Sequence, residues 1–323
     1  MLLLFFPIYY NLGMQGVFDN IKWWFLALRP KQWIKNLLVF AFIFFYRDIT
    51  NFYDLRKVFW AFISLIILSS SVYLINDVVD YKRDKLHPVK KNRPIAADKI
   101  SRKEAVVGSI IFFLLGLILA LSIGEYLLFI YIFYYFLVLF YSLYLKNVLI
   151  IDSLTNAVGF VLRVIAGGIV IGAPINSWFI IFIICASLFI SFGKRRAEIT
   201  MLSFKRASEH RSVLKDYPKE FLDSLISMTG AATFFSYILF SYTIDIGNST
   251  PALVSSVLPA HVKNPHWFKL TIPLGFYILA RYLYDIYVKK EGDAPETVWF
   301  EDRYILYSTI IYFIVSTFVI YVI

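Results

Sequence analysis

Residues 73–97 read YLINDVVDYKRDKLHPVKKNRPIAA, and in this stretch a hydrophobic segment turns abruptly into carboxylates and then into cations. Asn76, Asp80 and Asp84 are spaced four residues apart, so a helix would place them on one polar stripe. Polar groups at the end of a membrane span are costly unless they face a cavity, a partner or an ion. Oxygen ligands in this pattern suit Mg²⁺, which prefers a few carboxylates together with substrate phosphate oxygens.

The segment after these acids is strongly basic and suits a polyanion. Its cations are Lys82, Arg83, Lys85, Lys90, Lys91 and Arg93. Asp77 projects about 100° from Asn76 on a helix, so we expect it to support the ligands or to face another partner. The alternative is an acidic helix end before a basic loop, but a solvated face does not explain carboxylates beside so many cations. We therefore predict a site for a magnesium-bound diphosphate.

The composition excludes a soluble protein. The chain has 323 residues, of which 59% are hydrophobic and 19% aromatic, and its mean hydropathy is +0.69. Apolar runs of about 20 residues, long enough to cross a bilayer, recur along the whole length. These features predict an all-α polytopic membrane protein. The single cysteine, Cys185, excludes a disulfide framework and a cysteine-based metal site.

The apolar runs predict about nine transmembrane helices. We place them near 33–46, 58–79, 104–122, 127–145, 150–172, 177–193, 223–244, 268–288 and 304–323. Residues 17–29, with Trp23 and Trp24, are typical of an in-plane interfacial helix that ends before Pro30. We therefore expect an N-terminal interfacial arm over residues 1–29, rather than a signal peptide, and one transmembrane domain over residues 30–323.

The charges indicate an orientation. The net charge is +10, and the basic connections 81–103 and 194–219, as well as Lys146, all follow even-numbered predicted spans. They therefore share one membrane face, which the positive-inside rule assigns to the cytoplasm. This distribution favours a multi-pass protein of the cell membrane with a cytoplasmic site, and no feature indicates a nucleic-acid partner.

A second group of candidate residues lies in the stretch 141–168. Lys146 ends one predicted span, and Arg163 lies inside the next, where a buried cation indicates a functional site with an anionic partner. A structural pair with Asp152 is the alternative, but the two residues would lie about 16 Å apart along a helix, so each needs another partner. The small residues Ala166, Gly167 and Gly168 would permit close helix packing.

Three further motifs have bland alternatives. Lys194, in SFGKRRAE, is a candidate for a lipid phosphate or a plain interfacial anchor. Lys35, in RPKQWIKN, shares a helix face with Lys31, and both could simply snorkel to the interface. The acidic segment 291–303 is compatible with a cap over the basic site or a lid. The four histidines show no metal spacing; they are His87, His210, His261 and His266.

Taken together, these motifs resemble a known family. NDVVDYKRD followed by RPIA resembles the first signature of the UbiA superfamily of membrane prenyltransferases. RPKQWIKN, the stretch 141–168, KRRAE and GDAPE with EDR look like its decaprenyl-phosphate phosphoribosyltransferase branch, over roughly residues 25–308. One departure is Asp98, which stands where a glycine is usual.

The resemblance implies nine helices around a central cavity and the transfer of 5-phosphoribose from phosphoribosyl diphosphate (PRPP) to a polyprenyl phosphate. The product would feed synthesis of cell-envelope arabinan. Asn76 and Asp80 would hold Mg²⁺, with Asp84 supporting them. The residues with an implied catalytic role are Asp77, Asp80, Asp84 and Asp152. Those implied to bind PRPP are Lys35, Tyr73, Lys90, Lys146 and Arg163. Lys194 would bind the polyprenyl phosphate.

Two alternatives stay open. An aromatic prenyltransferase of the same superfamily would use a polyprenyl diphosphate and typically carries a second Asp-rich signature, but position 156 is Asn, so Asp152 lacks a DxxxD partner. A transporter or lipid-binding scaffold would spread its charges along a path through both faces, whereas here they gather on one. The sequence leaves a homo-oligomer possible.

Overall fold

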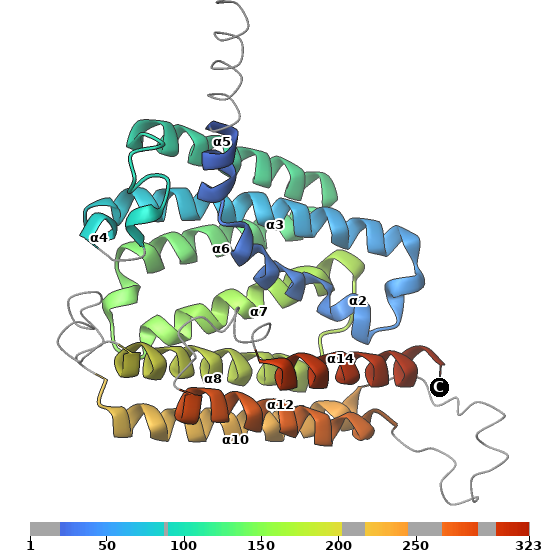
Figure 1. The fold of residues 1–323 in the computed structure, drawn as a ribbon. Helices are drawn as coiled ribbons and strands as arrows, with labels where there is room; N and C mark the ends of the chain where they lie inside the picture. Colours follow the sequence, from blue (N-terminus) through green and yellow to red (C-terminus); the bar gives the residue numbers. More distant parts are fainter. Residues whose placement is uncertain (1–19, 87–89, 202–216, 245–266, 290–301, 323) are drawn as a thin grey trace, which may run out of the picture. The chain divides into compact units, whose positions relative to one another are not determined.

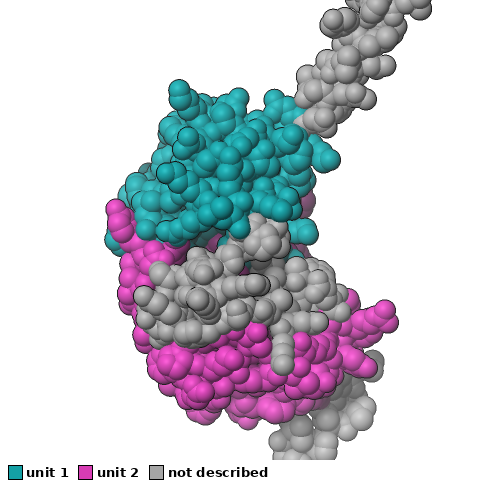
Figure 2. Space-filling view, turned by 60° about the vertical axis from the view of Figure 1, so that its left-hand side comes forward, with its two compact units in different colours: residues 1–36, 63–143 teal, residues 37–62, 144–323 magenta. Residues whose placement is uncertain are grey.

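The computed structural model describes residues 20–86, 90–201, 217–244, 267–289 and 302–322. Within these ranges all regular structure is helical (Figure 1). The chain forms two compact units, coloured separately in Figure 2: Met1–Asn36 with Ile63–Leu143, and Leu37–Phe62 with Tyr144–Ile323. We call them unit 1 and unit 2.

Unit 1 is built from long apolar helices and the polar segment between them. Its helices are the one over residues 20–27, α3 (Phe52–Val79, in this unit from Ile63 on), α4 (Tyr81–Leu86), η3 (Lys90–Asn92), α5 (Arg102–Ile123) and α6 (Glu125–Leu143). Helices α3 and α5 pack through small residues: Ser64 Oγ donates to Gly116 O at 2.8 Å, and Ser71 Oγ donates to Ser109 O at 2.8 Å. Small residues let helix backbones approach closely where lipid removes the hydrophobic drive.

Unit 2 holds the remaining helices. They are η1 (Pro30–Phe40, in this unit from Leu37 on), α2 (Ala41–Phe45), η2 (Asp48–Thr50), η4 (Leu145–Asn147), α7 (Ile151–Ile171), α8 (Ser177–Met201), α10 (Lys219–Thr243), η7 (Trp267–Thr271), α12 (Ile272–Tyr284), η8 (Asp285–Lys289), α14 (Arg303–Thr317) and η9 (Phe318–Val322). Helix α8 packs against α10 and α7, and α12 packs against α14 (Figure 1).

A close approach in unit 2 joins α7 and the residues around α2. A Cβ atom added to Gly167 would overlap the backbone carbonyl oxygen of Val39, and one added to Gly168 would lie 2.9 Å from the Phe42 ring. Phe42 is fully buried, and its ring centroid lies 5.3 Å from that of Phe179. The predicted close packing at the Ala-Gly-Gly run is therefore confirmed.

Seven helices of the described ranges are long and apolar enough to cross a membrane. They correspond to seven of the nine predicted spans, so the chain is an all-α integral membrane protein. The predicted span 33–46 is a 3₁₀ helix followed by the short α2, and the predicted span 268–288 combines η7, α12 and the π-helical η8. The count of nine, the central cavity and the in-plane position of residues 20–27 stay predictions, as does the division at residue 29.

Candidate functional site

The acidic stripe of unit 1 lies where α3 passes into α4. Although α3 ends at Val79, the helical hydrogen bonds continue across the junction. Asp80 N–H donates to Asn76 O at 2.9 Å, and Asp84 N–H donates to Asp80 O at 2.8 Å. The spacing that predicted one polar stripe is thus kept by the backbone.

Two carboxylates of this region are held by arginines. Asp77 and Asp84 are almost fully buried, with 2% and 4% of their surface exposed. Arg93 Nη1 donates to Asp77 Oδ1 at 3.0 Å and to Asp84 Oδ2 at 2.6 Å, and Arg29 Nη2 donates to Asp77 Oδ1. The Arg29 guanidinium also lies 5.0 Å from the centroid of the Tyr73 ring. Two guanidinium groups therefore balance two buried carboxylates.

Arg29 was missed by the sequence analysis, which assigned it to the interfacial arm. Its backbone has a positive φ of 53°, which is uncommon for a residue other than glycine. Arg93 was recognised only as one cation of a basic run. Burial raises the pKa of the Asp84 carboxyl, and the Arg93 guanidinium opposes that shift. The two arginines thus define the polar centre of unit 1 together with the acids.

Asn76 and Asp80 are the residues best suited to ligate a divalent cation. Asp80 is half-buried and lies 4.0 Å from Arg83, and Asn76 offers an amide oxygen one helical turn away. No three His, Cys, Asp or Glu side chains in the described ranges gather closely enough to hold a metal ion by themselves. This donor set fits Mg²⁺, which usually completes its shell with water and substrate phosphate oxygens.

The other candidates in unit 1 are Lys35, Tyr73 and Lys90. Lys35 Nζ donates to Gln32 Oε1 at 2.6 Å, and Lys90 opens the short helix η3. Both side chains are half-buried, as is Tyr73. A cation that keeps part of its surface accessible can still reach an anionic ligand.

The backbone conformation at position 98 suits aspartate as well as the glycine that the resemblance implies there. Its φ is +56°, a backbone conformation that glycine adopts freely and that aspartate tolerates better than most residues. Its carboxylate accepts hydrogen bonds from the Tyr81 hydroxyl and, at 2.6 Å, from Lys85 Nζ. The hydrogen bond from Lys85 also lowers the pKa of the Asp98 carboxyl. The loop is thus fixed to α4 by the side chain that replaces glycine.

In unit 2, Asp152 is fully buried and has two partners that the sequence analysis did not identify. Arg195 Nε lies 3.0 Å from Asp152 Oδ2, and the Tyr217 hydroxyl donates to Asp152 Oδ1 at 2.8 Å. Burial and the nearby carboxylate raise the pKa of Tyr217, so its hydroxyl stays protonated. Asp152 is therefore held by Arg195 and Tyr217 rather than by Arg163, and its catalytic role stays a prediction.

The cations of KRRAE therefore differ in their surroundings. Arg195 also pairs with Glu198 and is buried, and Arg196 Nε donates to Asp223 Oδ1 at 2.7 Å; Lys194 and Arg196 are both half-buried. Arg163 is 7% exposed on α7, and its Nη1 donates to Gly159 O at 2.7 Å. It is the most deeply placed candidate cation of this unit.

The segment between η4 and α7 contains a strained turn. Ile150 has φ +67° and ψ −43°, and Ile151 N–H donates to Leu149 O at 2.7 Å. This is a γ-turn of the rare, positive-φ type, here centred on a β-branched residue. Such backbone strain costs on the order of 1–3 kcal/mol and persists only where surrounding contacts fix it. The turn lies between the candidate residues Lys146 and Asp152.

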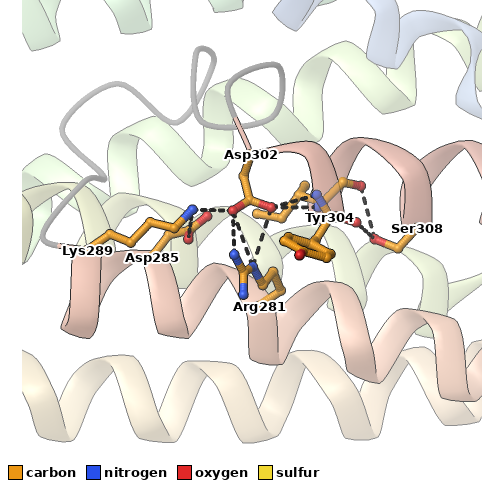
Figure 3. A network of polar contacts seen from close by, with 7 residues as sticks. Arg281, Asp285, Lys289, Asp302, Tyr304 and Ser308 are labelled. Carbon is orange, nitrogen blue, oxygen red and sulfur yellow. Dashed lines mark hydrogen bonds and ion pairs between the residues drawn. The ribbon is translucent and has the colours of Figure 1, made fainter.

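A third network surrounds Asp302. Of the predicted acidic segment 291–303, the described ranges contain Asp302 and Arg303. Residues 291–301 and all four histidines lie outside those ranges. Asp302 Oδ1 caps α14 by accepting from Tyr304 N–H and Ile305 N–H at 2.9 Å (Figure 3). Its Oδ2 accepts from Arg281 Nη2 at 2.8 Å and from Lys289, which also lies 2.9 Å from Asp285 Oδ1. Burial opposes ionisation, but these donors hold the pKa of Asp302 below its usual range.

Asp302→Ala should destabilise the protein by about 3 kcal/mol or more, because it removes a helix cap, leaves Arg281 without its carboxylate and leaves Lys289 with Asp285 alone. Asp302→Asn keeps an oxygen for the two backbone N–H groups, so it should cost about 1 kcal/mol less. Thermal unfolding in detergent measures both. Arg303→Ala, at an exposed neighbouring position, is the control and should change stability by less than about 0.5 kcal/mol. Equal losses in the Ala and Asn variants would exclude a contribution of the cap.

The comparisons with known proteins agree on one family. The model of the UbiA prenyltransferase family matches residues 37–300. Decaprenyl-phosphate phosphoribosyltransferase of Mycolicibacterium smegmatis is 31% identical over 287 residues, which cover 86% of this chain and 86% of that protein. The enzyme of the same name from Corynebacterium glutamicum is 31% identical over 288 residues, which cover 86% of this chain and 80% of that protein.

Solved structures show the same fold. A UbiA homolog from Archaeoglobus fulgidus bound to DMAPP and Mg²⁺ superimposes with a TM-score of 0.68 and 18% identity, over 93% of this chain and 99% of that chain. The family match over most of the sequence and the curated relatives therefore show that this chain belongs to the UbiA prenyltransferase family and is a membrane transferase.

Proposed function

We propose that this protein transfers 5-phosphoribose from PRPP to a polyprenyl phosphate at the cytoplasmic membrane face, in a Mg²⁺-dependent reaction that releases diphosphate. The observation that carries the proposal is the helical stripe of Asn76 and Asp80 beside the arginine-held acids. The relatives named decaprenyl-phosphate phosphoribosyltransferase, about 30% identical over 86% of the chain, support the choice of substrates. The product would feed synthesis of cell-envelope arabinan.

In this proposal, Asn76 and Asp80 hold the metal ion. Bound Mg²⁺ would neutralise charge on the leaving diphosphate. Asp77 and Asp84 instead fix Arg29 and Arg93, as their ion pairs indicate. The buried acids thereby keep the cations of unit 1 in place for an anionic substrate.

Polar and cationic side chains are assigned to the phosphates of the two substrates. Lys35, Tyr73, Lys90, Lys146 and Arg163 bind PRPP, and Lys194 binds the lipid phosphate. Two phosphorylated substrates account for this excess of cations better than one does. The assignment of Arg163 rests on its burial in α7, because a buried guanidinium in a membrane helix is typical of a functional site.

The chemistry needs little from the protein besides charge and position. The bond between ribose C1 and the diphosphate oxygen breaks with its electron pair on the diphosphate, and a lipid phosphate oxygen forms the new bond to C1. Positioned cations stabilise the charge that develops on the leaving group. The acceptor is already an anion, so no general base is required, and attack opposite the leaving group inverts C1.

The rival function is transfer of a prenyl group from a polyprenyl diphosphate to an aromatic acceptor. It would call for a second acidic metal site in unit 2, but there the carboxylate of Asp152 is paired with Arg195 and Tyr217. Asn156 Nδ2 donates to Asp152 O at 3.0 Å, so the position that would supply the second acid binds the helix backbone. These contacts favour a single metal site, in unit 1.

Membranes that contain the protein should transfer label from radiolabelled PRPP into the lipid phase when Mg²⁺ and a polyprenyl phosphate are supplied. Chelation of Mg²⁺ should stop the transfer, and membranes without the protein are the control. Transfer from a polyprenyl diphosphate to 4-hydroxybenzoate, with no label transferred from PRPP, would establish the rival function instead.

A further inference from the structure

The γ-turn at Ile150 has a strained, positive-φ backbone conformation, and isoleucine does not favour that conformation. A residue with positive φ is ordinarily Gly, Asn or Asp, and a β-branched side chain is an outlier there. The turn nevertheless closes, with Ile151 N–H donating to Leu149 O at 2.7 Å. Strain of this kind gathers at functional sites, where surrounding contacts fix it. The contacts that fix this turn therefore indicate what it serves.

The hydroxyl of Tyr217 is the contact that holds the turn. Ile150 N–H donates to Tyr217 Oη at 2.8 Å, and the hydroxyl in turn donates to Asp152 Oδ1 at 2.8 Å. Tyr217 is fully buried, and Arg195 neutralises the Asp152 carboxylate from the other side, with Nε 3.0 Å from Oδ2. One hydroxyl thus binds both the strained residue and the first turn of α7, far from it in sequence.

Backbone hydrogen bonds connect the turn to the short helix that contains Lys146. Val148 N–H donates to Leu145 O at 3.1 Å, and Asp152 N–H donates to Val148 O at 3.1 Å. These bonds join η4, which contains Lys146, to the first turn of α7 through the γ-turn itself. A change in the backbone at Ile150 would therefore shift the backbone of Lys146.

We propose that Tyr217 is a positioning residue, whose hydroxyl acts through the γ-turn at Ile150 to place Lys146 for a phosphate group of PRPP. The inference rests on the function proposed above. It makes the buried Asp152 an anchor for the Tyr217 hydroxyl, and it separates the requirements of the two substrates, because Lys146 is assigned to PRPP and not to the lipid.

Tyr217→Phe removes only the hydroxyl and tests the proposal. We expect the KM for PRPP to rise about tenfold, while kcat and the KM for the polyprenyl phosphate change by less than about twofold. Equilibrium binding of labelled PRPP to purified protein, without acceptor, should weaken by the same factor. In the Tyr217→Phe background, Ile150→Gly should restore the KM for PRPP to within about threefold of wild type, because glycine holds a positive φ without help.

Tyr237→Phe is the matched control. Its hydroxyl is also buried and bonded, but to Thr271 and Tyr312 rather than to a residue of the turn, so the KM for PRPP should stay unchanged. An unchanged KM for PRPP in Tyr217→Phe, or a rise that Ile150→Gly does not reverse, would overturn the inference while the proposed function stands. A wild-type protein that transfers no phosphoribose would overturn both.

Discussion

Asp80→Ala is expected to abolish phosphoribosyl transfer without unfolding the protein. Asp80 supplies the charged oxygen of the proposed Mg²⁺ pair, and metal stabilisation of a leaving group contributes several kcal/mol, so the rate should fall by at least about a thousandfold. Labelled-PRPP transfer in membranes measures the rate, and circular dichroism with thermal unfolding in detergent measures the fold.

The metal assignment itself has a sharper test in Asp80→Asn. This variant keeps an oxygen ligand but loses the charge, so the Mg²⁺ concentration for half-maximal activity should rise. Asp54→Ala is the control, since Asp54 lies on the same helix, away from the acidic stripe, in a half-buried pair with Lys57, and its loss should leave transfer unchanged. Turnover in Asp80→Ala above a tenth of wild type, or an unchanged Mg²⁺ requirement in Asp80→Asn, would remove Asp80 from the metal site.

Gly167→Ala is expected to prevent or strongly weaken folding of unit 2. The added Cβ would overlap the Val39 carbonyl oxygen, and backbone cannot move aside as a flexible side chain can. Overpacking usually costs about 1–3 kcal/mol, and this contact should reach or exceed the upper end. The yield of monodisperse protein and its unfolding temperature measure the effect.

Two other glycines grade this prediction. Gly168→Ala meets the Phe42 ring rather than backbone, so its loss of stability should be smaller. Gly124→Ala, at an extended position with nothing within 4 Å of the new atom, should be nearly neutral. A Gly167→Ala variant as stable as Gly124→Ala would mean that α7 does not pack so tightly beside Val39.

The sequence predicted the features that depend on local pattern. Apolar length placed seven spans, and the four-residue spacing of Asn76, Asp80 and Asp84 placed the acidic stripe, because both follow from helix geometry alone. The same pattern cannot distinguish an α-helix from the 3₁₀ helix at Pro30–Phe40, since both bury apolar residues at similar spacing.

Long-range pairing was beyond the sequence. The charge of Asp152 required a partner, but nothing local selected Arg195 over Lys146 or Arg163, and the bond joins residues on different helices. Arg29 likewise meets Asp77 across 48 positions of sequence. The Ala-Gly-Gly run predicted a close approach between helices, and only the structure identified Val39 as the residue whose backbone approaches Gly167.

Position 98 shows how a signature residue can be replaced without loss of the loop it serves. The backbone there demands a positive φ, which glycine meets by lacking a side chain and Asp98 meets while bonding Tyr81 and Lys85. Both residues satisfy the same requirement for a positive φ. Glycine does so through its conformational freedom, and Asp98 does so while its side-chain hydrogen bonds hold the loop in place. A signature that allows only glycine at this position is therefore too strict, because Asp98 meets the same backbone requirement in this chain.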